Sequence, residues 1–194
     1  MKYIHYCDNP KLYINWKSKW NTPCGIHAYH KTFADEKEKK SDLYFGMDRK
    51  YKVYLDIDTS NVLNLNDYKL KRNDMAKLNL LCNKLKLDFD SIQKNSFRNP
   101  KYNNDAGILW SIMYNLLDNY FDYNSFDKDE EEISDGWVIA KNNKPAISWN
   151  KLIRWLGYEC VIDNGLGIIH EHEPWQSLFL TMSSFKINNV VKRI

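Results

Sequence analysis

The chain has 194 residues, of which 43% are hydrophobic and 14% aromatic, so it is long enough to form one domain with a substantial core. The net charge is +3 with basic and acidic residues mixed along the chain, which is weak support for nucleic-acid binding. No apolar stretch is typical of a signal peptide or a membrane span, so we expect a cytoplasmic protein without a membrane partner. The four cysteines are scattered without a C-x-x-C pair, which predicts reduced thiols.

The first third of the chain predicts three strands. Lys2–Cys7 reads as a short strand, in which alternation places His5 on the face of the odd-numbered residues. Ile26–His30 reads as a second strand, and the alternating segment Tyr51–Ile57 as a third. The polar segment Ala34–Lys40 between them predicts a helix that lies in solvent.

The middle of the chain predicts helices. Leucine and methionine recur at steps of three to four residues from Asn66 to about Leu87, and Gly107–Phe121 shows a second helical pattern. Asp127–Glu132 is an acidic run that we interpret as a solvated loop rather than a metal site. We therefore predict a single α+β domain over residues 1–194, with a mixed or antiparallel sheet and a helical insert at about 66–132. Residues expected to be buried in the insert are Leu78, Leu81, Ile112 and Leu116.

The last third predicts a helix and two further strands around a polar run. Ser148–Leu156 reads as a short helix, with Ser148 as its N-cap and Gly157 as its stop. Tyr158–Ile162 and Gln176–Leu180 read as strands, and the run His170–Glu173 lies between them. Ionisable groups between two apolar strands are costly to bury, so this run is a first place to look for a functional site.

Three groups of polar residues are candidates for that site. His5 is one, although a single histidine in a strand is more often structural. The second strand carries His27 and Tyr29 on one face, and Gly25 just before it would let a ligand approach the backbone. The H-x-H pair at 170–172 has the spacing of two zinc ligands on one strand face, but no third ligand is evident nearby.

The segment Trp149–Ile187 resembles the C-terminal end of ADP-ribosyltransferase-like domains of bacteriophages and mobile-element polyvalent proteins. Those domains tend to end in a helix, a Gly-Tyr strand, a Gly-rich turn, an "IH..EP.Q" run and a final strand. In the N-terminal half, His5 within KYIHYC resembles their first-strand histidine, and Gly25–Tyr29 resembles their "GIY" strand. The region that covers the nicotinamide is resembled by Phe45–Gly46, Arg49, Tyr51 and Tyr54. The helical insert is not covered by this resemblance.

The resemblance implies an NAD-dependent ADP-ribosyltransferase of phage or mobile-element origin, with NAD as co-substrate and a host protein or nucleic acid as target. NAD is cleaved between nicotinamide and ribose through an oxocarbenium-like state. The resemblance implies that His5 holds the ribose hydroxyls and that Tyr29, Tyr51 or Phe45 stacks on the nicotinamide, beside Gly25 and Arg49. A carboxylate or amide at the start of the last strand grips the 2′-hydroxyl and favours the developing positive charge.

Two positions depart from the family pattern. His27 stands where the second strand often has tyrosine, and Gln176 stands where the catalytic glutamate is most often found. An amide can hold a hydroxyl but supplies no charge, whereas Glu173, three residues earlier, would restore the charge if it reaches the site. The alternatives are a catalytically inactive domain of the same fold that binds a protein or nucleotide, and an unrelated small α+β binding protein.

The transferase hypothesis makes a geometric demand. His5, the second-strand pair His27 and Tyr29, and Gln176 or Glu173 should converge on one cleft. A structure with His5 on the opposite side of the sheet from Gln176 would remove the transferase interpretation outright.

Overall fold

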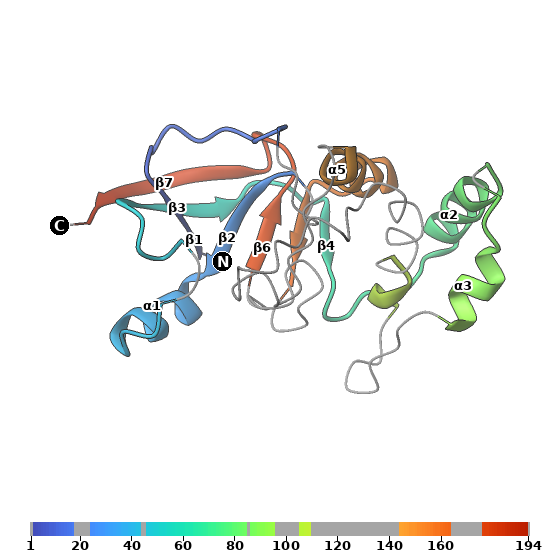
Figure 1. Cartoon of the computed structure of the whole chain (residues 1–194), viewed down its shortest axis with the longest axis horizontal. Coiled ribbons are helices and arrows are strands. Elements are labelled where there is room, and N and C mark those ends of the chain that lie inside the picture. Colours follow the sequence, from blue (N-terminus) through green and yellow to red (C-terminus); the bar gives the residue numbers. More distant parts are fainter. Residues whose placement is uncertain are drawn as a thin grey trace, which may run out of the picture.

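A seven-stranded mixed sheet forms the centre of the molecule, with the strand order β4-β5-β6-β2-β1-β3-β7 (Figure 1). β4 and β5 are parallel, and all other neighbouring strands are antiparallel. The strands are β1 (Lys2–Cys7), β2 (Ile26–His30), β3 (Tyr51–Ile57), β4 (Val62–Asn64), β5 (Cys160–Ile162), β6 (Gln176–Phe179) and β7 (Phe185–Lys192). The computed structural model describes residues 2–17, 24–43, 46–84, 86–95, 105–109, 144–163 and 176–193. The α+β class is as expected.

The strands with the clearest alternation were predicted at their observed bounds. β1, β2 and β3 coincide with the expected strands, whereas β5 begins at Cys160 and β6 ends at Phe179, both within the expected segments. The sequence analysis did not predict β4 or β7. β4 has only three residues, which is too short for alternation to be recognised, and β7 is exposed from Lys186 to Lys192, so it has no buried side to detect.

The helices beside the sheet begin earlier than expected. α1 spans Lys31–Lys39 and α5 spans Lys144–Leu156. Ser148 therefore lies inside α5, and its assignment as the N-cap was wrong. The helix can begin before Ser148 because Pro145 is tolerated in the first turn, where a backbone N–H has no partner within the helix. Gly157 ends α5 with a φ of +108°, which confirms the expected stop.

The described part of the insert is helical. α2 spans Arg72–Lys84, α3 spans Phe89–Asn95, and residues 106–109 form a short helical turn. Leu78 is fully buried and Leu81 is partly buried, as expected for a helix with one apolar side. The remainder of the expected second helix, including Ile112 and Leu116, and the acidic run 127–132 lie outside the described residues.

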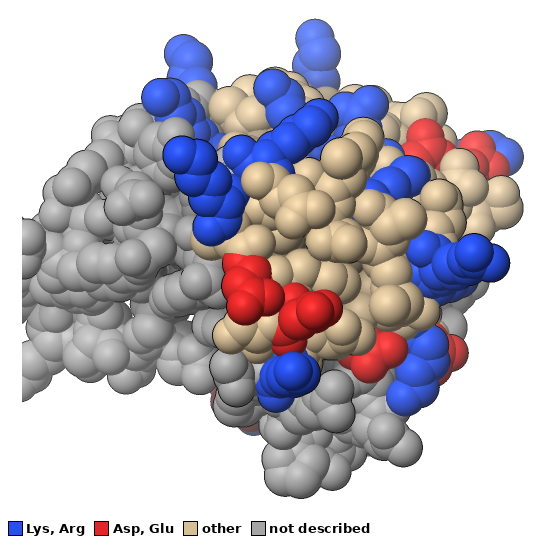
Figure 2. Space-filling view, turned by 90° about the vertical axis from the view of Figure 1, so that its right-hand side faces the viewer, with Lys and Arg blue, Asp and Glu red and all other residues tan. Residues whose placement is uncertain are grey.

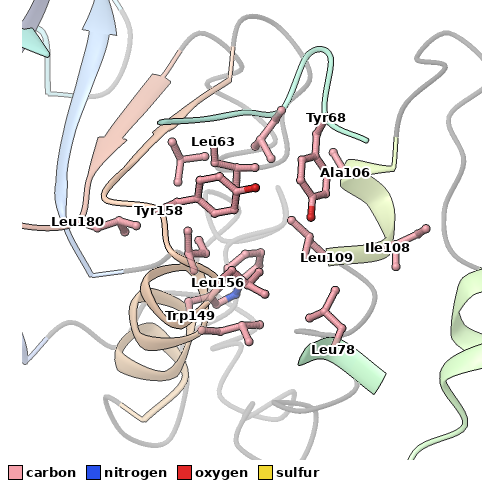
Figure 3. Packing of buried hydrophobic residues seen from close by; sticks show 14 of the residues in the cluster. Leu63, Tyr68, Leu78, Ala106, Ile108, Leu109, Trp149, Leu156, Tyr158 and Leu180 are labelled. Carbon is pink, nitrogen blue, oxygen red and sulfur yellow. The ribbon is translucent and has the colours of Figure 1, made fainter. Parts of the chain in front are cut away.

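The largest hydrophobic core joins the insert to the sheet (Figure 3). Leu78 of α2, Trp149 and Leu156 of α5, and Leu178 of β6 all contribute to it. Burying a side chain of this size stabilises the fold by about 1.5–3 kcal/mol. α5 thus packs between the edge of the sheet that holds β4 and the helices of the insert.

The other two cores lie on opposite faces of the sheet, which we call the Tyr3 face and the α1 face. The Tyr3 face carries Tyr3, Val53 and Phe179 in one core, which also includes Ala146 of α5. The α1 face carries Ile4, Tyr6 and Tyr29, and α1 covers it with Phe33 and Ala34. Alternation in β1 and the pairs Tyr3–His30 and Ile4–Tyr29 assign each side chain of β1 and β2 to one of these faces.

Asn150 fixes α5 to the ends of two strands. Its side-chain amide donates to the carbonyls of Cys24, at 2.6 Å, and Leu180, at 3.1 Å. Asn150 is fully buried, so these bonds satisfy carbonyls that water cannot reach. No helix in the described ranges is long and apolar enough to cross a membrane.

Candidate functional site

The candidate site centres on a side-chain pair between β2 and β6. Gln176 is the first residue of β6 and pairs with Tyr29, while His27 pairs with Leu178, so His27 and Gln176 are diagonal neighbours on one face. The Nδ1 atom of His27 lies 3.0 Å from the amide oxygen of Gln176, across 149 residues of sequence. Sequence reasoning therefore selected two residues that the fold brings into contact.

The hydrogen bond fixes the proton of the His27 ring. An amide oxygen can only accept, so the Nδ1 atom of His27 carries the proton that it donates. Gln176 is only 5% exposed, and His27 is partly exposed. The pair is thus a donor–acceptor unit, with the amide anchored in the core and the imidazole nearer the surface.

His5 joins this pair through the backbone. Its Nδ1 donates to the carbonyl of His27 at 2.6 Å, just beyond Ile4–Tyr29, the last described pair of the β1–β2 ladder. Burial lowers the pKa of His5, and the nearby His27 ring lowers it further, while the bond to the carbonyl opposes them. His5 is therefore neutral at pH 7, with its proton on Nδ1.

The expected convergence on one cleft is not found, because His27 contacts Gln176 but His5 lies on the opposite side of the sheet. His5 alternates with Ile4 and Tyr6, so it belongs to the Tyr3 face, whereas Gln176 pairs with Tyr29 on the α1 face. His5 therefore lies on the opposite side of the sheet from Gln176, with its ring bonded to the backbone of His27. This arrangement removes the transferase site as the sequence analysis framed it, with His5 holding a ribose beside Gln176.

Tyr29 has a different surrounding from the one expected of a stacking residue. Its side chain is 4% exposed, and its ring is stacked on Phe33 at 5.9 Å and meets Tyr6 edge-on at 6.1 Å. These contacts make Tyr29 part of the core beneath α1. A nicotinamide cannot stack on this ring while α1 is in place.

Gly25 is explained by packing inside the protein. A Cβ atom at this position would lie 2.4 Å from Cδ1 of Leu178 and 2.7 Å from the carbonyl oxygen of Phe179. The close approach is therefore that of β6, and it replaces the expected approach of a ligand.

The remaining expected cofactor residues do not join the His27–Gln176 pair. Arg49 is exposed and binds Asp8 at 2.5 Å. Tyr51 lies on β3, where it pairs with Cys7 of β1. β1 separates β3 from β2, so Tyr51 is one strand further from His27. Phe45, Glu173 and the H-x-H pair at 170–172 lie outside the described residues.

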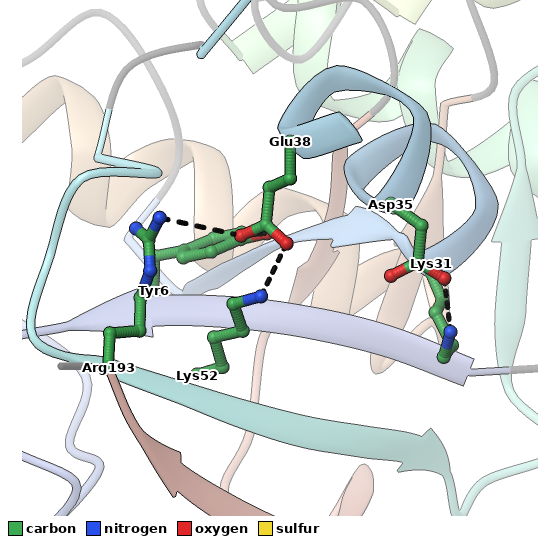
Figure 4. A network of polar contacts seen from close by, with 6 residues as sticks. All are labelled: Tyr6, Lys31, Asp35, Glu38, Lys52 and Arg193. Atoms are coloured by element: carbon green, nitrogen blue, oxygen red, sulfur yellow. Dashed lines mark hydrogen bonds and ion pairs between the residues drawn. The ribbon is translucent and has the colours of Figure 1, made fainter. Parts of the chain in front are cut away.

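Two carboxylates that the sequence analysis did not single out have dense polar surroundings. Asp74 of α2 accepts hydrogen bonds from the hydroxyls of Tyr68 and Tyr158, both at 3.0 Å. Glu38 of α1 accepts a bond from Tyr6 at 2.9 Å and pairs with Lys52 and Arg193 (Figure 4). Neither residue belongs to a sequence motif, because their partners come from distant elements.

The described chain holds no group of three His, Cys, Asp or Glu side chains that could bind a metal ion. All four cysteines are free thiols, as expected. No family model, curated protein or solved structure matches this chain. The family resemblance therefore rests on the residues quoted above and stays a prediction.

Proposed function

We propose that the chain is an ADP-ribosyltransferase-like protein of phage or mobile-element origin that binds NAD where β2 and β6 adjoin, in an arrangement that does not use His5 as the family pattern does. The observation that supports this function is the contact between His27 and Gln176, while His5 bonds to the backbone of His27 from the other face of the sheet. These are three of the positions that carry the family resemblance. They are 22 and 149 residues apart in the chain, yet they stand on three neighbouring strands.

The chemistry of the pair suits a ribose. A ribose hydroxyl both donates and accepts, and an amide N–H and an unprotonated imidazole nitrogen are complementary to it. The amide of Gln176 carries no charge, so it can hold a hydroxyl by hydrogen bonds alone. We assign His27 and Gln176 to ribose binding, and we assign His5 a positioning role, because it holds the carbonyl of His27.

Transfer of ADP-ribose needs more than this pair. The bond between nicotinamide and ribose breaks, nicotinamide leaves with the electron pair, and a nucleophilic atom of the host macromolecule bonds to the ribose carbon and loses its proton. A carboxylate near the ribose favours the positive charge that develops during this step. Gln176 cannot supply that charge, so we assign the role to Glu173, three residues before it in the sequence.

The binding half of the proposal is tested by calorimetry with NAD. We expect Gln176→Ala to weaken NAD binding about tenfold or more, because a buried amide that bonds the ligand is lost. Lys39→Ala, an exposed change at the end of α1, is the matched control. Unchanged NAD binding in a folded Gln176→Ala protein would exclude the site.

The transfer half is tested with labelled NAD and a host lysate. We expect labelled macromolecules from the wild type, and a loss of rate of about 10²-fold in Glu173→Gln with little change in NAD affinity. A carboxylate that acts in the transition state lowers turnover more than binding when it is removed.

A second candidate function is a catalytically inactive module that binds a nucleotide or a protein. The amide at position 176 favours it, because the start of β6 carries no charge. NAD binding without labelled products, and without effect of Glu173→Gln, would identify this alternative. Activity gained by Gln176→Glu would then show that only the charge is missing.

A further inference from the structure

The outer sides of α2 and α5 carry a concentration of positive charge that the composition of the chain does not reveal. Only one acidic residue occurs in these two helices, and it is Asp74, which is 3% exposed and bonded to two tyrosines. Lys and Arg side chains run along the top of this end of the molecule (Figure 2). The basic residues of the two helices are Arg72, Lys77, Lys84, Lys144, Lys151 and Arg154.

Four of these basic residues, Lys77, Lys84, Lys151 and Arg154, together with Trp155 form what we call the α2–α5 strip. Lys151, Arg154 and Trp155 lie at i, i+3 and i+4 and so share one side of α5. Lys77 connects the helices, because its Nζ donates to the carbonyl of Trp155 at 2.8 Å and lies 5.6 Å from the centre of the indole ring. Lys84 follows two turns later on the same side of α2.

Trp155 is the least expected member of the strip. Its side chain is 43% exposed, although it is the last tryptophan of a helix whose Trp149 is buried in the core. An exposed indole among cations is a platform on which a nucleic-acid base can stack, while the cations neutralise phosphates.

We propose that the α2–α5 strip binds single-stranded nucleic acid, with the backbone along the lysines and arginine and a base on Trp155. A single strand is favoured over a duplex, because the bases of a duplex already stack on one another and leave no face for the indole. An acidic polypeptide could satisfy the cations but would make no use of an exposed planar ring.

The strip is built on helices and does not include β1, β2 or β6. Binding therefore requires neither NAD nor the His27–Gln176 pair, and it can be measured without NAD. The result is then independent of the transferase proposal.

The test is fluorescence anisotropy with a labelled 15-nucleotide single strand, as DNA and as RNA, and with the matching duplex. We expect Lys151→Gln/Arg154→Gln to weaken binding about tenfold and to reduce the salt slope by about 1.4, since two phosphate contacts are lost. Lys39→Gln/Lys40→Gln, which removes the same charge from the exposed end of α1, should leave binding unchanged. Trp155→Leu should cost about tenfold on the single strand and little on the duplex.

Three results would overturn the proposal. They are equal losses in the α1 control, undetectable binding at low salt, and equal displacement of the strand by polyglutamate of matched charge, which would mark a general polyanion surface. Circular dichroism confirms folding of each variant. If Lys151→Gln/Arg154→Gln does not fold, Lys84→Gln, an exposed single change, tests the same surface.

Discussion

Two carboxylates attach helices to the sheet domain in opposite ways. Asp74 of α2 is 3% exposed, and its two described partners are the hydroxyls of Tyr68 and Tyr158. Glu38 of α1 has a side chain that is 17% exposed and meets two cations, Lys52 and Arg193, in addition to the Tyr6 hydroxyl.

The difference shows how burial decides whether a hydrogen bond or an ion pair contributes more to stability. A hydrogen bond to a charged acceptor contributes about 1.5–3 kcal/mol, and deep in the core neither water nor salt weakens it. An ion pair near the surface is screened, and it contributes about 0–1 kcal/mol. The insert is therefore held by hydrogen bonds that salt does not reach, whereas α1 is held partly by charges that salt weakens.

The largest effect is expected from Asp74→Ala. Two tyrosine hydroxyls would be left without an acceptor, at about 1–3 kcal/mol each, so we expect a loss of about 2–6 kcal/mol in the free energy of unfolding. Urea denaturation measures it, with the exposed Asp67→Ala as the control. If the loss is below 1 kcal/mol, the tyrosines find other partners and the comparison fails. Tyr68→Phe in the Asp74→Ala background should recover part of the loss, because one stranded hydroxyl is then gone.

A smaller and salt-dependent effect is expected from Glu38→Gln. The amide keeps an acceptor for Tyr6 but removes the charge opposite Lys52 and Arg193, so we expect a loss of about 1–2 kcal/mol at low salt. The loss should shrink in 1 M NaCl, while that of Asp74→Ala should not. Asp35→Asn, which breaks an exposed pair with Lys31 on the same helix, is the matched control. If the losses for Asp74→Ala and Glu38→Gln depend equally on salt, burial does not distinguish the two carboxylates.

The sequence predicted those parts of the fold in which local pattern and burial agree. β1, β2 and β3 alternate because one face of each packs in a core, and Gly157 ended α5 because a positive φ favours glycine. The start of α5 was misplaced because Ser148 resembles an N-cap, while the helix actually begins near a proline. β7 was missed because an exposed edge strand has no pattern to detect.

The sequence selected His27 and Gln176 as site residues, but it did not predict how the strands place the other candidates around them. The contact of His27 with Gln176 depends on diagonal pairing of β2 with β6, and motif order alone cannot specify that register. The same holds for Tyr29, whose position in the sequence resembles a stacking residue, but whose ring α1 covers. The partners of Asp74 lie 6 and 84 residues away, so no local signal marks it.

Stability at high pH should depend on Tyr158 of the Asp74 cluster but not on an exposed tyrosine. Burial, then the bond to Asp74, raises the pKa of Tyr158 to about 12 from 10.0. A raised pKa means that its stabilising effect is complete below pH 10 and is lost as pH rises through about 12, because the unfolded chain then gives up the proton first. We expect Tyr158→Phe to flatten the decline of stability in this window, and Tyr13→Phe, at a side chain that is 68% exposed, to leave it unchanged. An unchanged slope in Tyr158→Phe would show that the cluster opens before the tyrosine titrates.

The smallest effect is expected from Lys77→Gln, which tests whether the insert also depends on charge. Lys77 donates to the carbonyls of Trp155 at 2.8 Å and Leu156 at 3.4 Å, which are among the last carbonyls of α5. A cation at a helix C-terminus stabilises by about 0.3–1 kcal/mol, and glutamine is too short to replace both bonds. We therefore expect a loss of at most about 1 kcal/mol by urea denaturation, with Lys84→Gln, an exposed lysine of the same helix, near zero. A loss for Lys77→Gln that equals that of Asp74→Ala would show that the insert is held by this cation as firmly as by the buried carboxylate, and the contrast with α1 would no longer hold.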